Sequence, residues 1–136
     1  MTLLSNLIVD QAAATDFWGS DRVRPVIDTV ANELLARDVT VLLAVSPEGH
    51  RVVGALSYAR PGVFSVWRRG DNTVPALVDG VTASLLAAQD VASRFQIPDS
   101  AVTVVLEAPG FDRFGDTAAV TIPLDGGKPR RRLAAV

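Results

Sequence analysis

The sequence contains no cysteine and a single histidine, His50. Disulfides, thiolate chemistry and the common zinc sites built from Cys and His are therefore excluded. The patterns of a nucleophilic serine elbow, a phosphate-binding loop and a dinucleotide-binding glycine motif are missing as well. We therefore expect no catalytic residue, no metal site and no cofactor, and the sequence favours a protein without enzymatic activity. We interpret His50 as an exposed side chain beside a turn.

Long apolar runs are also absent, since no stretch approaches the roughly 18–20 residues that span a bilayer. The N-terminal segment is apolar in part, but no basic residue precedes its apolar portion, unlike the start of a signal peptide. We therefore expect a cytoplasmic protein, or a component of a particle assembled in the cytoplasm, with no membrane partner.

Positive charge is scarce outside the C-terminus. Residues 1–127 contain nine Arg against fifteen Asp and Glu, a formal charge of −6, whereas the whole chain carries −2. The remaining cationic residues are Lys128, Arg130, Arg131 and Arg132. A nucleic-acid-binding domain carries a basic face, so nucleic acid is not an expected partner except through this tail. We divide the chain into a single α+β domain, residues 1–127, and a basic C-terminal tail, residues 128–136.

Apolar residues are abundant, at 49% of the chain against 21% charged, as in folded globular domains. The longest amphipathic pattern is Thr73–Phe95, in which apolar residues recur at spacings of three and four. This period predicts a long helix with one buried stripe. Similar patterns predict a short N-terminal helix within the first 14 residues and a second helix over Arg22–Arg37.

Five other segments have the composition of β-strands: Val39–Val45, His50–Ala59, Val63–Trp67, Ala101–Ala108 and Thr117–Leu124. The apolar run Val39–Val45 predicts a central strand that is buried on both faces. Ser46-Pro47-Glu48-Gly49 has the composition of a turn, so we expect His50–Ala59 to be the second arm of a hairpin. The order is then α-α-β-β-β-α-β-β. Short turns between successive strands predict an α+β fold with a mainly antiparallel sheet of about five strands and helices on one face.

Part of this pattern resembles the roadblock family. The resemblance covers Arg22–Arg37, the stretch VTVLLAVSPEGHRVVGALS (residues 39–57) and the Ala- and Leu-rich helix that follows. It implies a small dimeric adaptor that acts with a GTPase. The strand Val63–Trp67, the 109–116 loop and the lack of a closing C-terminal helix depart from the family pattern, so the resemblance is an analogy at the level of the fold.

The best candidate site is the loop over residues 109–116, whose central residues are Phe111, Asp112, Arg113 and Phe114. Its Asp side chains suit local turn hydrogen bonds, and its Phe side chains either fold back onto the sheet or contact a partner. The alternative is that Asp112 and Asp116 act as an acid–base pair or hold a divalent cation.

Two further segments are candidates for partner contacts. Phe17 and Trp18 are interpreted mainly as anchors of a connector to the core, but Trp18 is also a candidate interface residue. In the tail, Arg130, Arg131 and Arg132 are candidates for docking on an acidic surface of a neighbouring subunit. The RGD tripeptide Arg69-Gly70-Asp71 is interpreted as a solvated loop.

These features together predict a non-catalytic structural or adaptor subunit of a larger, virion- or particle-like assembly. Its partners would be further copies of itself or other protein subunits. The apolar N-terminal segment, the separable tail and the missing catalytic motifs motivate this expectation. Two alternatives remain open: a dimeric roadblock-like adaptor for a GTPase, and a small cofactor-free enzyme or ligand-binding protein that uses Asp and Arg of residues 109–116.

Overall fold

The computed structural model describes residues 17–80, 85–98, 100–107, 120–124 and 128–131. The expected N-terminal helix and the loop over residues 109–116 lie outside these ranges. The described elements are α2 (Val23–Ala36), β1 (Val41–Ala44), α3 (Pro47–Ala59), β2 (Ser65–Val66), β3 (Ala76–Asp79), α4 (Leu85–Arg94), β4 (Thr103–Glu107), β5 (Val120–Pro123) and β6 (Arg130–Arg131). None of the helices in these ranges has the length and apolarity that a membrane crossing requires.

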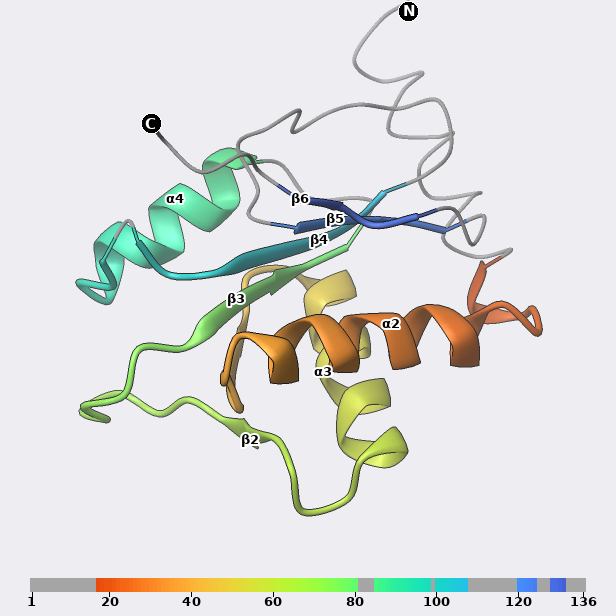
Figure 1. Ribbon diagram of the computed structural model, residues 1–136. Coiled ribbons are helices and arrows are strands. Elements are labelled where there is room, and N and C mark those ends of the chain that lie inside the picture. The colour runs from red at the N-terminus through yellow and green to blue at the C-terminus, as the bar shows by residue number, and fades with distance from the viewer. Residues whose placement is uncertain (1–16, 81–84, 99, 108–119, 125–127, 132–136) are drawn as a thin grey trace, which may run out of the picture.

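The six strands form one sheet in the order β2-β1-β3-β4-β5-β6 (Figure 1). Strands β1 to β5 are all parallel to one another, and only β6 runs antiparallel, along β5. The expectation of a mainly antiparallel sheet of about five strands is therefore wrong. Strand β1 is also not central, because it lies next to the edge strand β2 and the middle positions belong to β3 and β4.

The main cause of this error is helix α3, which replaces the second arm of the expected hairpin. Ser46 caps the helix by accepting a hydrogen bond from the Gly49 amide at 3.0 Å, and Pro47 occupies the first turn. The buried residues of α3 follow a helical period: Gly49, Val52, Val53 and Leu56. A helix between β1 and β2 brings the chain back to start β2 in the same direction as β1, which makes the pair parallel.

The stretch Thr73–Phe95 forms two elements rather than one helix. Its first part contains β3, in which all four residues are buried, and its second part contains α4. The helix expectation is thus wrong for Ala76–Asp79 and confirmed for Leu85–Arg94. A short strand that is buried on both faces does not alternate between polar and apolar residues. The apolar residues of β3 therefore also fitted the helical spacing of the residues that follow, and the two elements were predicted as one helix.

The helices cover both faces of the sheet, not one face as expected (Figure 1). Leu42 and Val78 point to the face covered by α2 and α3 and belong to the larger apolar cluster, with Val30, Leu34, Val52 and Leu56. The adjacent strand residues Leu43, Val45 and Leu77 point to the opposite face, where they pack with Val91, Ala92 and Phe95 of the α4 region. This alternation follows from the two-residue period of a strand.

The strand order reverses direction between β1 and β3. From β1 the chain proceeds through α3 to β2 on one side, whereas from β3 it proceeds through α4 to β4 on the other side. With right-handed crossovers, opposite directions place the two helices on opposite faces, which is the doubly wound arrangement. In such sheets the carboxyl ends of the two strands at the reversal form the usual place for a ligand.

Candidate functional site

The carboxyl ends of β1 and β3 meet at the reversal point of the sheet, where Val45 and Val78 are joined by a backbone hydrogen bond of 3.1 Å. Beyond β1, Ser46 and Glu48 begin α3, and beyond β3 the chain continues through Asp79 and Gly80. The polar residues at this edge therefore come from two segments that are about thirty positions apart in the sequence.

Asp79 and Ser46 are joined directly. The Ser46 hydroxyl donates a hydrogen bond to Asp79 Oδ1 at 2.6 Å, and the Gly80 amide donates to the same oxygen at 2.8 Å. The Asp79 side chain is completely buried. Because Ser46 Oγ also accepts the Gly49 amide hydrogen bond, this single hydroxyl links the start of α3 to the end of β3. The pair positions the helix on the sheet.

Two glycines allow the helix to approach the sheet closely. A Cβ on Gly49 would lie 2.3 Å from the Val78 carbonyl oxygen, and a Cβ on Gly80 would lie 2.3 Å from the Cβ of Glu48. Both distances are far shorter than van der Waals contact. The first turn of α3 is thus in close contact with the end of β3.

Phe17 and Trp18 pack beside Glu48 and Gly80 at this edge. Phe17 is 1% exposed, which confirms its role as a core anchor, and its ring meets the Trp18 ring edge-to-face at a centroid distance of 5.0 Å. Trp18 Nε1 donates to Glu48 Oε2 at 2.6 Å. The cavity left among these side chains, Gly80, Leu106 and Leu124 has a volume of about 10 Å³, close to the smallest space that holds one water. Among the described residues, these side chains therefore fill most of the space around this cavity.

The basic residues of the expected tail extend the domain's own sheet. Arg130 and Arg131 form β6, opposite Thr121 and Val120 of β5. The Arg131 guanidinium makes a two-pronged contact with the carboxylate of Glu33 on α2, with Nε 3.1 Å from Oε2 and Nη2 bonded to Oε1. This hydrogen bond, followed by the Glu33 charge, raises the pKa of Arg131 above its ordinary value. The acidic group that Arg131 contacts in this structure thus belongs to its own chain.

The remaining predicted site residues lie elsewhere. Phe111, Asp112, Arg113, Phe114 and Arg132 fall outside the described residues. His50 is exposed, as expected, but it lies in the first turns of α3 rather than beside a hairpin turn. In the described part of the chain, no three His, Cys, Asp or Glu side chains gather in a way that would hold a metal ion.

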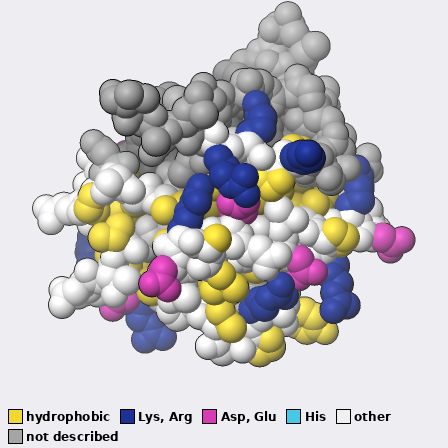
Figure 2. All heavy atoms as spheres, in the orientation of Figure 1, with side chains coloured by type: hydrophobic (Ala, Val, Ile, Leu, Met, Phe, Trp, Pro, Cys, Tyr) yellow, Lys and Arg dark blue, Asp and Glu magenta, His cyan; other side chains and the backbone are white. Residues whose placement is uncertain are grey.

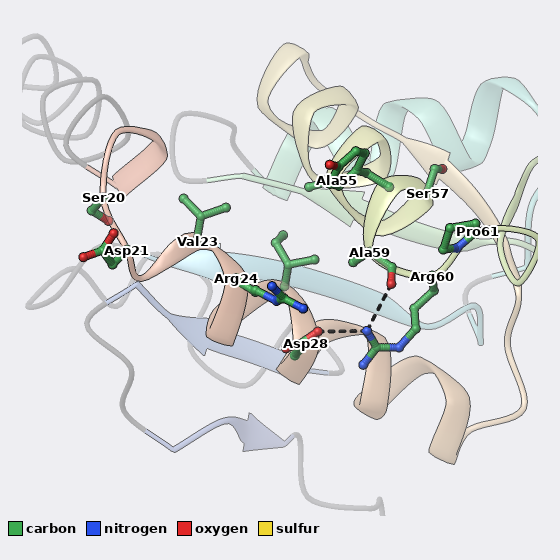
Figure 3. Close-up of a pocket in the computed structure, with 12 residues that line it drawn as sticks. Ser20, Asp21, Val23, Arg24, Asp28, Ala55, Ser57, Ala59, Arg60 and Pro61 are labelled. Atoms are coloured by element: carbon green, nitrogen blue, oxygen red, sulfur yellow. Dashed lines mark hydrogen bonds and ion pairs between the residues drawn. The ribbon is translucent and has the colours of Figure 1, made fainter.

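An open groove of about 980 Å³ lies between α2 and α3 (Figure 3). Asp28 of α2 and Arg60, which follows α3, bridge it through an ion pair of 2.9 Å. The Tyr58 side chain is 90% exposed and also lines the groove. On the face seen in Figure 2, acidic, basic and apolar side chains are interspersed rather than segregated.

The sequence contains patterns that indicate a helix start at Ser46 and a strand end at Asp79. The interpretation of residues 46–49 as a turn overlooked the first of them. Ser-Pro-Glu is a helix-start pattern, with a capping residue, a proline in the first turn and an acidic residue near the positive end of the helix dipole. Asp79 directly follows the apolar run Ala76–Val78, where a parallel strand ends. Their pairing is a tertiary contact, and no local pattern encodes it.

Comparisons of this chain with protein-family models, with curated proteins and with solved structures found no match.

Proposed function

We propose that this chain is a non-catalytic subunit of a larger assembly and that it associates through the groove between α2 and α3. The observation that supports this is the exposed Tyr58 at an open groove of about 980 Å³. Tyr is among the residues that contribute most to protein interfaces, because a rigid ring buries a large area and its hydroxyl remains able to hydrogen-bond. An aromatic ring that is 90% exposed is available for such a contact without unfolding.

The charges around the groove favour a second copy of the chain as the partner. Its lining contains two acidic residues, Asp21 and Asp28, and two basic residues, Arg24 and Arg60. In a two-fold symmetric dimer the same patch meets itself, so a patch with equal numbers of both signs can place acids opposite bases. A patch of a single sign would repel itself. The groove is therefore suited to a symmetric contact.

The two alternatives lack comparable support. The roadblock analogy included a hairpin over residues 39–57, and the structure has β1 followed by α3 in that stretch. The enzyme alternative depends on residues 109–116, which lie outside the described ranges. At the reversal point of the sheet, the described cavity beside Phe17, Trp18 and Glu48 has a volume of only about 10 Å³.

The test is the mass in solution of the wild type and of Tyr58→Ala, measured by light scattering over a range of concentrations. We expect the wild type to reach at least the dimer mass and Tyr58→Ala to dissociate at concentrations at which the wild type is associated. Val74→Ala is the matched control, because Val74 is also exposed, at 45%, but does not line the groove. Raised salt should weaken association, since the groove charges are near the surface.

Both variants should keep the wild-type melting temperature of the folded domain, because their side chains are exposed. A wild type that remains monomeric at every concentration would contradict the proposal. Equal association of Tyr58→Ala and the wild type would show that the interface lies on another surface.

A further inference from the structure

A second concavity, of about 480 Å³, lies between the β2–β3 connection and the C-terminal end of α4. Its volume is within the range of small-molecule sites. The connection contributes Trp67, Arg69 and Asn72, and the helix end contributes Arg94 and Gln96. In Figure 1 both segments lie on the left of the molecule. This concavity shares no lining residue with the cavity at the reversal point or with the α2–α3 groove.

Aromatic rings hold one arginine of this concavity in place. Trp67 and Phe95 meet edge-to-face with a centroid distance of 5.5 Å and an interplanar angle of 65°. The Arg69 guanidinium lies over the Phe95 ring, 5.4 Å from its centroid. Within the described part of the chain, Arg69 makes no ion pair. Its positive charge is therefore oriented by a ring and is not neutralised by a carboxylate.

Hydrogen bonds between Arg68 and Asp71 hold the loop that carries Arg69 in a turn. The Asp71 amide donates to the Arg68 carbonyl at 2.9 Å, which closes a four-residue turn. Gly70, the third residue of this turn, has a φ of +95°, and a positive φ at that position is the requirement of a type II turn. The Asp71 carboxylate accepts a hydrogen bond from the Arg68 amide at 2.9 Å. Asp71 is thus engaged within the turn, and Arg69 is the group of the RGD tripeptide that remains available to a ligand.

The second arginine, Arg94, forms an exposed ion pair that a ligand can replace. Arg94 forms an ion pair with Asp90 at 2.5 Å, one helical turn earlier, but the two side chains are 61% and 65% exposed. Exposed pairs at this spacing contribute little to stability. A ligand oxyanion can therefore replace the Asp90 carboxylate at small cost.

We infer that Arg69 and Arg94 bind the oxyanion of a small molecule, a carboxylate or a phosphate. A guanidinium presents paired N–H donors that match two oxygens of either group, and both arginines line the same concavity. The Asn72 and Gln96 amides at the same concavity are further donors. The lining carries two Arg and one Asp, so it is locally positive on a chain whose formal charge is −2. This local charge attracts anions.

The experiment titrates the full chain with sodium pyrophosphate and, separately, with citrate, each into the millimolar range at low ionic strength. Binding is measured by calorimetry and by the fluorescence of Trp67, with Trp67→Phe identifying its contribution to the signal of the two tryptophans. The variants are Arg69→Gln, Arg94→Gln and the double variant. Arg51→Gln is the matched control, since Arg51 also lies over an aromatic ring, 6.0 Å from the Trp18 centroid, but outside this concavity.

We expect saturable binding of at least one anion, a dissociation constant raised about fivefold or more in each single variant, and no saturable binding in the double variant. Arg51→Gln should bind like the wild type. The preferred anion identifies the ligand as a phosphate or a carboxylate. Absence of saturable binding of both anions by the wild type would overturn the inference. So would equal weakening in Arg51→Gln, which would indicate a general effect of net charge.

Discussion

The close approach of α3 to β3 allows a sharp test with two glycines of the same helix. Gly49 lies in the first turn of α3, where an added Cβ would be 2.3 Å from the Val78 carbonyl oxygen. Gly54 lies in the middle of the helix, and an added Cβ there would meet no atom within 4 Å. Replacing each by Ala adds the same methyl group to the same helix in two different environments.

The intrinsic helix propensity favours both substitutions, because Ala is more stable than Gly in a helix interior by roughly 0.5–1 kcal/mol. At Gly54 this gain in helix propensity is the only change in stability that we expect. At Gly49 the methyl group must displace a backbone carbonyl by about 1 Å to reach ordinary contact, and overpacking of this kind typically costs 1–3 kcal/mol or more. We therefore expect Gly54→Ala to stabilise the domain by about 0.5–1 kcal/mol and Gly49→Ala to destabilise it by about 1–3 kcal/mol.

The assay is urea unfolding followed by circular dichroism, with thermal melting as a second measure. For a chain of this length 1 kcal/mol corresponds to a shift of about 3–5 °C in the melting temperature. The two variants should therefore shift in opposite directions. A Gly49→Ala variant at least as stable as the wild type would refute the packing of α3 on the end of β3. A Gly54→Ala variant that loses several kcal/mol would indicate that residue 54 is not in an exposed helix.

Two further predictions concern polar contacts. Ser46→Ala removes both the helix cap and a donor to the buried Asp79 carboxylate, so we expect a loss of about 2–4 kcal/mol in the free energy of unfolding. Ser57→Ala, in the exposed part of the same helix, should change it by less than about 0.5 kcal/mol, and equal losses in both would contradict the role of Ser46. Arg131→Ala should lower the urea midpoint, because it leaves the Glu33 carboxylate, 7% exposed, without its Arg131 partner. The double variant Glu33→Gln/Arg131→Ala should recover part of this loss, since a neutral amide is easier to bury. A double variant no more stable than Arg131→Ala would mean that the charge of Glu33 is unimportant.

Local patterns were sufficient for elements whose periodicity is unambiguous. Helix α2 was predicted over Arg22–Arg37 and is observed over Val23–Ala36, because its apolar stripe is long and clear. Strands β1, β2, β4 and β5 were predicted from runs rich in β-branched, aromatic and Leu residues, and each lies within its predicted segment. Composition and the missing motifs could also be read directly from the chain.

Local patterns failed where two periods fit the same residues. In His50–Ala59 the alternation of larger and smaller side chains fitted a strand, although Val52 and Leu56 also have the spacing of one helical face. In Thr73–Asp79 a short buried strand resembled the start of a helix. Because of these two errors the sheet was predicted to be antiparallel although it is mostly parallel. The direction of each strand depends on whether a helix or a tight turn precedes it.

The amino-acid pattern alone located the apolar segments, helix α2 and four of the strands, and it excluded the common metal sites built from Cys and several His residues. The order of the strands, the contact of Ser46 with Asp79 and the contact of Glu33 with Arg131 depend on how the whole chain packs. The two contacts join residues that are 33 and 98 positions apart in the sequence. Such pairs form only after the chain has buried its core, so the packing of the whole domain selects them and no local preference does.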